Sequence, residues 1–392
     1  MATVLQGSIT TADPLSDEQV VDMKNEFAEL DPDDSQFTTL LVKLGTRQAV
    51  REKISWLEDQ LRPRLSALAA SATSAATSIT VTGGDGNTLF AADDIVRNLV
   101  SGELMHVTGT AASALTVERN IGTHSTTAST GATDALFIVG SAYKQGASYG
   151  TSRIVKRVLG FNYTEIVRDP FSFTGTETSI EEYGGRNPAK EQVKKLVEHK
   201  QSIEETLFWG ARNFDSTNKR GYSGGAYEFI SSNVNTAVGN LDKSTFDGQI
   251  TTALLHGNQN SKALFVAPVV AKAMSGFLRD NWVRATPDES RWGVHVDSWI
   301  SGAYGADIPV FIKRYWGNFT TSATSGTISP ASAAFLIDMD YVRYAPLRDR
   351  DTSLLLKRQN PGDDLDSREY LTEFSLEFAQ EKCHAAWFGV TG

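Results

Sequence analysis

The chain has 392 residues, of which 40% are apolar and 21% are charged, so it can build a folded core and is not globally disordered. Its net charge of −10 comes from 47 acidic and 37 basic side chains and gives no overall attraction to nucleic acid. The single cysteine, Cys383, excludes a disulfide framework within the monomer. The sequence shows neither a secretory signal nor an apolar run of the ~18–20 residues that span a bilayer. We therefore expect a protein made in the cytoplasm and not held in a membrane.

The first 45 residues are acidic, with nine Asp or Glu and two lysines. Ser16 begins a predicted capped amphipathic helix over residues 16–30, whose apolar positions repeat at helical spacing: Val20, Met23, Phe27 and Leu30. Residues 31–34 break this helix, and a second short helix is predicted over residues 37–44. Two small helices make a poor independent domain. We expect them to need a partner surface, either on the rest of the chain or on a neighbouring subunit.

Residues 53–61 fit either a strand or a helix, and Pro63 ends the segment. From residue 67 to about residue 141 the composition changes to Ala, Ser, Thr and Gly, and no lysine occurs between Lys53 and Lys144. Short β-like runs are predicted at residues 78–82, 94–99, 104–108, 114–118 and 135–139, with a hairpin turn at 83–87. This pattern indicates a small inserted β-domain, and its many Thr residues suit strands with one solvated face.

Residues 144–186 form a more polar, extended segment in which strands are predicted at 163–167 and 171–173. Pro170 between them favours a sheet edge or a bend. Asn187 and Pro188 then begin the longest predicted helix, of roughly 22 residues, within residues 187–213. One stripe of this helix is apolar, and the pairs Glu191–Lys195 and Lys200–Glu204 are predicted to stabilise it.

The region after this helix alternates between helices and strands. Helices are predicted at residues 245–256 and 268–280, a buried strand at 263–267, and a strand at 310–313 entered through Pro309. From Ala334 onward apolar runs alternate with charged turns, which predicts a terminal β-layer. Within it, residues 370–378 alternate in the manner of a half-buried antiparallel strand.

Motifs for catalysis, metal or phosphate binding are weak. His295 and Asp297 offer two metal ligands without a third nearby, and the glycine-rich residues 221–225 lack a phosphate-binding lysine, so we interpret them as a flexible loop. Cys383 and His384 are expected to point in opposite directions, and Cys383 is expected to pack as a small apolar residue. We expect no catalytic residue, metal or cofactor.

Two charged groups are better explained by contacts between subunits. Glu198, Glu204 and Glu205 lie on the long helix among lysines, which favours a solvated or intersubunit face over a pair of catalytic carboxylates. A basic run is interleaved with or followed by aspartates, which favours intersubunit ion pairing over DNA binding: Arg348, Arg350, Lys357 and Arg358.

The order of these parts resembles the major capsid protein of tailed bacteriophages, in a family with an inserted β-domain before the extended loop. The resemblance rests on residues 55–59, 102–107, 161–166, 183–186, 198–200 with Glu204, 208–212 and 354–385. Together these stretches span most of the chain. The poorest matches are residues 1–45 and 318–332.

The resemblance implies an α+β, HK-97-type capsid fold. Its implied parts are an N-terminal arm (1–45) reaching under a neighbour, a first part of the peripheral domain or extended loop (46–66), the inserted β-domain (67–142), an extended loop over an adjacent subunit (143–186), a peripheral domain with a spine helix (187–240), an axial domain (241–333) and a peripheral β-layer (334–392). Its implied intersubunit contacts are Trp56, Glu58, Arg157, Tyr163, Arg168, Arg186, Glu198, Lys200, Arg348 and Arg350.

The implied function is self-assembly, through hexamers and pentamers, into an icosahedral head that encloses a double-stranded DNA genome without sequence-specific binding. Implied partners are other copies of the chain, a portal, a separate scaffolding protein and possible decoration proteins. We expect no removal of the arm and no lysine–asparagine crosslinks, and we expect the inserted domain to face outward. Alternatives left open are a decoration or tail component, an encapsulin-like compartment shell, and a hydrolase acting through carboxylates.

Overall fold

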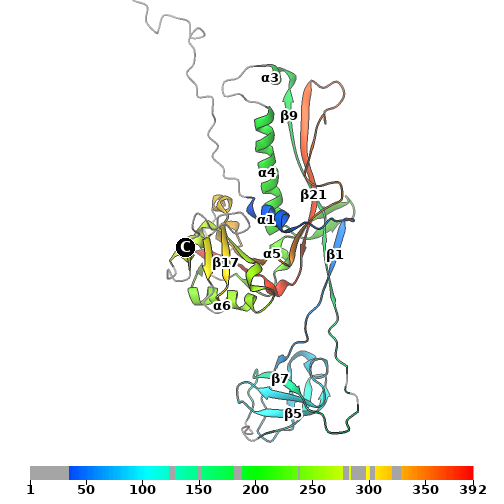
Figure 1. Ribbon diagram of the computed structural model, residues 1–392, viewed down its shortest axis with the longest axis vertical. Helices are drawn as coiled ribbons and strands as arrows, with labels where there is room; N and C mark the ends of the chain where they lie inside the picture. Colours follow the sequence, from blue (N-terminus) through cyan, green and yellow to red (C-terminus); the bar gives the residue numbers. More distant parts are fainter. Residues whose placement is uncertain are drawn as a thin grey trace, which may run out of the picture. The chain divides into compact units, whose positions relative to one another are not determined.

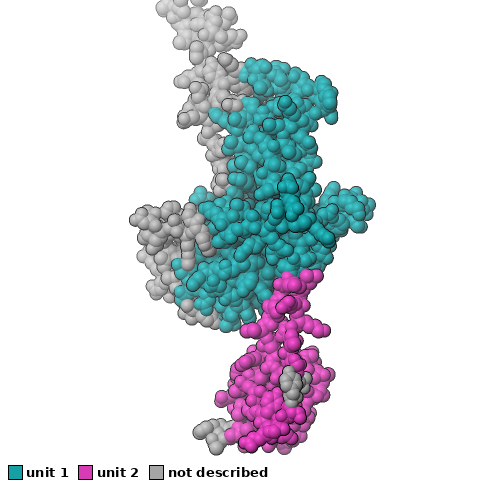
Figure 2. Space-filling view, turned by 45° about the vertical axis from the view of Figure 1, so that its right-hand side comes forward, with its two compact units in different colours: residues 1–56, 160–392 teal, residues 57–159 magenta. Residues whose placement is uncertain are grey.

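Figure 1 shows the computed structural model of the chain. The structure describes residues 35–122, 129–148, 150, 152–180, 188–236, 239–276, 282–283, 297–300, 305–319 and 328–391. The helix predicted over residues 16–30 lies outside these ranges. The chain divides into two compact units, which Figure 2 colours separately: unit 1 is Met1–Trp56 with Gly160–Gly392, and unit 2 is Leu57–Leu159.

Unit 2 is built on one six-stranded antiparallel sheet in the order β2-β7-β4-β5-β6-β3. An isolated bridge between Leu68 and Val81 joins the segments that continue the two outer strands, so the sheet curls toward closure. One side of the sheet is packed with apolar residues such as Val96, Met105 and Leu136, all fully buried. The strands are β2 (Leu65–Ala67), β3 (Ser78–Thr80), β4 (Asp94–Asn98), β5 (Leu104–Ala111), β6 (Ala114–Glu118) and β7 (Ala135–Ser141).

The hairpin turn predicted at residues 83–87 is wrong. The segment instead forms a 3-10 turn, η2 (Thr82–Gly84), followed by a short helix, α2 (Asp85–Thr88). Gly83 and Gly84 both have positive φ, at 65° and 85°, a backbone region that glycine enters without steric cost. Gly86 lies against the backbone, since a Cβ there would be 2.0 Å from the carbonyl oxygen of Ala111. The glycine run therefore packs helical turns against β5.

A long helix on an extended sheet forms one half of unit 1. Helix α4 (Pro188–Trp209) lies along strands β9 (Glu165–Thr174) and β21 (Leu365–Phe378), which pair antiparallel (Figure 1). On its other side β21 pairs with β19 (Val342–Pro346) and β20 (Ser353–Leu355). β9 is thus an edge strand among the described residues, which confirms the edge position predicted from Pro170.

Residues 370–378 lie in the antiparallel strand β21, as predicted, but the strand is not half-buried. Phe374, Leu376 and Phe378 are buried, but so are Glu373 and Ser375 on the opposite face. The Ser375 hydroxyl donates to the carbonyl of Tyr163 at 2.8 Å, and the Thr164 hydroxyl donates to the Glu373 carboxylate at 3.0 Å. A segment distant in sequence therefore covers the polar face.

The other half of unit 1 contains a seven-stranded sheet in the order β12-β22-β18-β14-β17-β16-β15. Its pairs β14–β17 and β12–β22 are parallel, and the others are antiparallel. The single terminal β-layer predicted from Ala334 onward is wrong, because its strands divide between this sheet and the β21 sheet. The strands are β12 (Val234–Asn235), β14 (Lys262–Val266), β15 (Trp282–Val283), β16 (Asp297–Ile300), β17 (Asp307–Ile312), β18 (Ala334–Asp338) and β22 (Ala385–Trp387).

The main core joins both halves of unit 1. Helices α1 (Gln36–Leu44), α4, α6 (Lys243–Leu254) and α7 (Pro268–Ser275) contribute to one buried cluster with strands of both large sheets. Strand β14 is buried at every position, as predicted for residues 263–267, and α6 confirms the helix predicted at 245–256. Residues 277–280 of the predicted helix at 268–280 lie outside the described residues. None of the described helices is long and apolar enough to cross a membrane.

The remaining elements of unit 1 are short. Strand β1 (Lys53–Glu58) pairs with β8 (Val158–Tyr163). Residues 53–58 are therefore a strand, where the sequence was compatible with a strand or a helix. The other short elements are α3 (Gly175–Ser179), β10 (Asn213–Asp215), β11 (Arg220–Tyr222), α5 (Ala226–Phe229), β13 (Gly239–Asn240), η3 (Gln259–Ser261), η5 (Arg314–Asn318), η6 (Pro330–Ser332), η7 (Glu381–Cys383) and β23 (Val390–Thr391).

Candidate assembly site

The N-terminal helix α1 is fastened to the spine helix α4 by one buried carboxylate. Glu204 accepts hydrogen bonds from the backbone N–H groups of Phe37 at 2.8 Å and Thr38 at 2.7 Å. The ammonium of Lys313 lies 2.7 Å away, and both charged side chains are essentially inaccessible to solvent. A carboxylate at a helix N-terminus satisfies N–H groups that lack intrahelical partners and complements the helix dipole.

Aromatic packing reinforces this fastening. The ring of Phe37 lies 4.6 Å from that of Phe208 on α4 and 5.0 Å from that of Phe265 on β14. The Trp316 indole N–H donates to Glu205 at 3.0 Å. The start of α1 is therefore part of the core of unit 1.

The sequence predicted that Glu204 and Glu205 lie on a solvated or intersubunit face. The structure corrects this for Glu204, which is buried, whereas Glu205 is partly exposed. Glu204 pairs with Lys313 and the start of α1, and the predicted Lys200–Glu204 pair is replaced by this buried arrangement. Lys195 forms its salt bridge with Glu198, while Glu191, its predicted partner, contributes a weaker electrostatic attraction. The partners of Glu204 are more than 100 residues away in the sequence. The only local indication that Glu204 is buried was its position next to Ile203 on the apolar stripe of the helix.

A buried histidine links α4 to the sheet. His199 is fully buried, with Nδ1 2.5 Å from a carboxylate oxygen of Asp169 and Nε2 2.7 Å from the hydroxyl of Thr372. The Thr372 hydroxyl in turn donates to Thr352 at 2.9 Å. This chain of polar contacts crosses from α4 to β9, β21 and the segment before β20. Its centre, His199 and Thr372, is fully buried, so these contacts hold the helix on the sheet.

The opposite face of the β9–β21 sheet carries arginines. Arg168 and Arg358 both bind the carboxylate of Glu369, with Arg358 Nε at 2.9 Å, and Arg350 lies 2.6 Å from Glu373. The acidic side chains are buried, whereas the three arginine side chains are 51%, 50% and 43% exposed. Burial opposes ionisation of Glu369, but the two guanidinium groups outweigh it and lower its pKa below the ordinary value. We call this surface the arginine face.

The base of the β1–β8 ribbon is held by Asn162, which is fully buried. Its side-chain amide donates to the carbonyls of Leu376 at 2.8 Å and Gly224 at 3.0 Å, and its oxygen accepts from the Gly224 N–H at 2.8 Å. The Ser223 N–H donates to Glu165, and burial raises the pKa of that carboxyl while this bond opposes the shift. The flexible-loop interpretation of residues 221–225 is thus wrong.

Glycine is required in this loop because the chain packs closely around it. A Cβ at Gly221 would lie 2.1 Å from the carbonyl oxygen of Thr164, and one at Gly225 would lie 2.6 Å from that of Thr206. The glycines therefore permit close approach of the loop backbone to α4 and to the junction between β8 and β9.

The predicted contact residues have different environments. Trp56 is only 7% exposed and packs with Ile54 and Ala345 inside its own chain, because Gly160 leaves room for its indole ring. Tyr163 stacks on Phe214 at 5.3 Å. The others lie at or near the surface, except Arg186, which lies outside the described residues: Glu58, Arg157, Arg168, Glu198, Lys200, Arg348 and Arg350.

The first and last segments of unit 2, residues 57–65 and 154–159, expose a concentration of apolar side chains. These are Leu57, Leu61, Leu65, Ile154, Val158 and Leu159, each between 56% and 94% exposed. Isolated exposed apolar residues are ordinary on a protein surface, but a group on two neighbouring segments marks an interaction surface.

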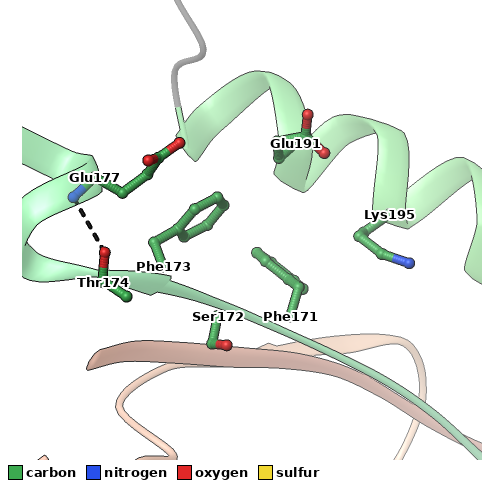
Figure 3. A pocket seen from close by; sticks show the side chains of 7 residues that line it. All are labelled: Phe171, Ser172, Phe173, Thr174, Glu177, Glu191 and Lys195. Carbon is green, nitrogen blue, oxygen red and sulfur yellow. Dashed lines mark hydrogen bonds between the residues drawn. The ribbon is translucent and has the colours of Figure 1, made fainter. Parts of the chain in front are cut away.

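A shallow pocket lies between the end of β9, α3 and the first turns of α4. Figure 3 shows the rings of Phe171 and Phe173 on the side of β9 that faces α4, where Glu191 and Lys195 project. The pocket thus combines two phenyl rings with charges of both signs. Its full lining is Phe171, Ser172, Phe173, Thr174, Glu177, Glu191 and Lys195.

The residues singled out for chemistry are structural where they are described. Cys383 is buried, as predicted for a packed small residue. His384 is fully buried, and its Nδ1 accepts from the N–H of Asp338 at 3.0 Å while Nε2 lies 3.0 Å from the carbonyl of Ala379. Among the described residues no group of three or more His, Cys, Asp or Glu side chains is placed to hold a metal, and His295 lies outside them.

A spine helix on an extended sheet, a second sheet that shares its core and an inserted β-unit together define the HK-97-type capsid class. The chain matches the family model described as the SU10 major capsid protein over residues 5–391 and belongs to that family. It is a capsid protein of phage type that forms a shell from copies of itself, and its place is the capsid of the virion. Membership in a structural family assigns it a structural role.

Solved structures with similar folds are only distantly related in sequence. A structure from Microbacterium phage Oxtober96 is 11% identical, covers 98% of this chain and 99% of its own, and has a TM-score of 0.48. The capsid of a native GTA particle is 7% identical, with 97% and 98% coverage and a TM-score of 0.48. The SrpI encapsulin of Synechococcus elongatus is 13% identical, with 60% and 78% coverage and a TM-score of 0.41. No curated protein sequence matches the chain.

Proposed function

We propose that the chain assembles through hexamers and pentamers into an icosahedral head that encloses a double-stranded DNA genome. The observation that carries this proposal is the group of exposed apolar residues on the two segments that lead into and out of unit 2. Six large apolar side chains on these two segments are each at least 56% exposed. A neighbouring copy that covered them would gain about 25 cal/mol for each Å² removed from water.

The net charge of the chain is compatible with a shell that encloses DNA without binding it. With a net charge of −10, it repels DNA in general, so packaged DNA can move against the shell without being bound. Many modest contacts between copies then give a strong shell by multivalency. Assembly takes place in the host cytoplasm, with a portal and a separate scaffolding protein as partners and with room for a decoration protein.

The surface residues among the predicted contacts belong to this proposal. Arg168 and Arg350 lie on the arginine face, while Arg157 pairs with Asp59 at 3.4 Å near the exposed apolar group. Arg157 and Asp59 are both more than half exposed, so their ion pair contributes little to stability. Charged groups of a neighbouring subunit can therefore replace either partner at little cost in free energy.

The test is electron microscopy of the chain expressed alone and with its neighbouring genes. Closed icosahedral particles are the expected result. The double variant Val158→Ser, Leu159→Ser should reduce particle yield, while Leu255→Ser, an equally exposed change at the end of α6, should not. Monomers in every sample of the parent chain would contradict the proposal.

A further inference from the structure

The helices α1 and α4, which pack against each other, expose charged residues of one sign only. Helix α1 contains a single charged residue, Lys43, which is exposed. Helix α4 contains four lysines and four glutamates, so these residues give it no net charge. All of α4 is described, and its exposed charged residues are Lys190, Lys194 and Lys200. We call α1 and α4 together the helix layer.

Two of the four glutamates of α4 bind partners near the end of the helix. Glu204 is buried under the start of α1, where the ammonium of Lys313 neutralises it at 2.7 Å. Glu205 is partly exposed and accepts a hydrogen bond from the indole N–H of Trp316 at 3.0 Å. Both carboxylates are therefore turned toward the second half of unit 1.

The other two glutamates of α4 are associated with the fourth lysine, Lys195. Glu198 forms a salt bridge with this lysine, and Glu191 attracts it from the preceding turn. Figure 3 shows Glu191 and Lys195 beside the pocket that α4 forms with β9. The folded chain thus pairs or covers the acidic side chains of α4 and leaves three lysines exposed.

These three lysines lie along one face of α4. With 3.6 residues per turn, positions 190, 194 and 200 fall within about one third of the helix circumference. At 1.5 Å per residue, the first and the last are about 15 Å apart along the axis. A DNA strand presents a phosphate about every 3.4 Å along its axis, so a face of this length can lie beside several phosphates.

We propose that the helix layer is the surface of the shell that faces the enclosed DNA, with Lys190, Lys194 and Lys200 against its phosphate backbone. This inference rests on the proposed shell function. A chain with a net charge of −10 repels DNA in general, and a surface that exposes lysines meets the least repulsion. Contacts of this kind are independent of sequence and are screened by salt, so packaged DNA can still move past them.

The arginine face on the opposite side of the sheet fits this role less well. Two of its arginines bind Glu369 and the third binds Glu373, so its excess over these carboxylates is one positive charge. The face of α4 presents three exposed lysines instead. A shell that is one subunit thick can turn only one of two opposite faces inward.

Formaldehyde crosslinking of DNA-filled particles tests the contact directly. Formaldehyde joins a lysine amine to an amine of a DNA base through a methylene bridge and releases water, so it marks lysines that lie against DNA. After digestion of the DNA, mass spectrometry identifies the lysines that carry a base. The expected result is such adducts on Lys190, Lys194 and Lys200 in filled particles and their absence from empty particles.

Three other lysines of unit 1 serve as controls. Lys219, Lys272 and Lys382 are also exposed, but they lie outside the helix layer. They should react with a small amine reagent in unassembled chain as readily as the lysines of α4. In filled particles they should carry DNA adducts only at the level found in empty particles.

Charge reversal supplies a second measurement. Lys190→Glu, Lys194→Glu and Lys200→Glu are combined in one chain, and the three control lysines are replaced by Glu in another, so both variants change the net charge equally. Filled particles of each are diluted into low salt, where charges are least screened. A larger share of particles with the α4 changes should lose their DNA, while the control variant should retain DNA like the parent.

The outcomes separate this inference from the proposed function. Equal adducts on the α4 and control lysines, no adducts on the α4 lysines of filled particles, or links from these lysines to a protein chain in place of DNA would overturn the inference. Equal retention of DNA by the two variants would also overturn it. Failure of the parent chain to form closed shells, or closed shells that never enclose DNA, would instead contradict the proposed function.

Discussion

The ammonium of Lys313 lies 2.7 Å from the carboxylate of Glu204, and both side chains are buried. Glu204 also binds the first N–H groups of α1. One buried ion pair thus connects the N-terminal helix, the spine helix and the segment that follows β17. In a shell protein this arrangement couples the position of the N-terminal segment to the integrity of the core.

Replacing Glu204 by Gln should destabilise unit 1 strongly. The buried charge of Lys313 would lose the opposite charge of Glu204, and removing one member of a buried ion pair costs about 3–5 kcal/mol. Urea unfolding of unassembled chain measures this change. Glu198→Gln, on the same helix but 41% exposed, is the matched control and should change the free energy of unfolding by less than about 1 kcal/mol. Equal effects of the two changes would contradict the assigned role of Glu204.

Shortening Phe37 to Ala should release α1 from the core. The side chain is fully buried between Phe208 and Phe265, and Phe-to-Ala changes in cores cost about 3–5 kcal/mol. Limited proteolysis should then cut within residues 36–44 at rates well above those of the parent chain. Val42→Ala, at a position 52% exposed on the same helix, should behave like the parent. Unchanged protection in Phe37→Ala would show that packing of this ring does not hold α1.

His384 should make stability fall at acid pH. Burial lowers its pKa to about 4, below the ordinary value of 6.5. Between these two pH values the unfolded chain binds a proton that the folded chain does not, so the free energy of unfolding falls as the pH is lowered from 6.5 toward 4. The full loss is roughly 3 kcal/mol.

Unfolding curves at pH 7.5 and pH 5 measure this loss. His384→Asn keeps an acceptor for the Asp338 N–H but removes the titration, so its difference between the two pH values should shrink. His256→Asn, at an exposed position, should keep the difference seen in the parent chain. A variant at position 384 with undiminished pH dependence would show that another group is responsible.

Two glycine-to-alanine changes should act in opposite directions. A Cβ at Gly160 would lie 2.3 Å from Nε1 of Trp56, so Gly160→Ala should cost about 1–3 kcal/mol by overpacking. Gly248 lies inside α6 with nothing within 4 Å of an added Cβ, and Gly248→Ala should stabilise by about 0.5–1 kcal/mol. Thermal melting of the two variants and the parent checks both signs. Stabilisation by Gly160→Ala would refute the close packing against Trp56.

Local patterns were sufficient for many of the elements. The run that begins at Asn187 and Pro188 predicts a helix, and α4 occupies Pro188–Trp209. The strand predicted at residues 114–118 coincides with β6, and the buried run at 263–267 is β14 within one residue. Each of these depends on periodicity and on end signals within about 20 residues, which the sequence displays directly.

Local patterns failed where a residue's partner is distant in the chain. Glu204 looked like a solvated acid among lysines, yet it binds Phe37, 167 residues away, and Lys313, 109 residues away. The alternating pattern predicted that Glu373 and Ser375 lie on the solvent-exposed face of a strand. A segment more than 200 residues earlier in the chain covers them instead.

The order and type of most elements could thus be predicted from the amino-acid sequence, and the order of its motifs indicated the capsid class. Three features became known only from the folded chain: which charges are buried, how the C-terminal strands divide between two sheets, and which side of the β9–β21 sheet presents its arginines. Secondary structure follows short-range periodicity and caps. Burial and pairing instead depend on which distant segments meet, and a pattern of neighbouring residues does not encode that.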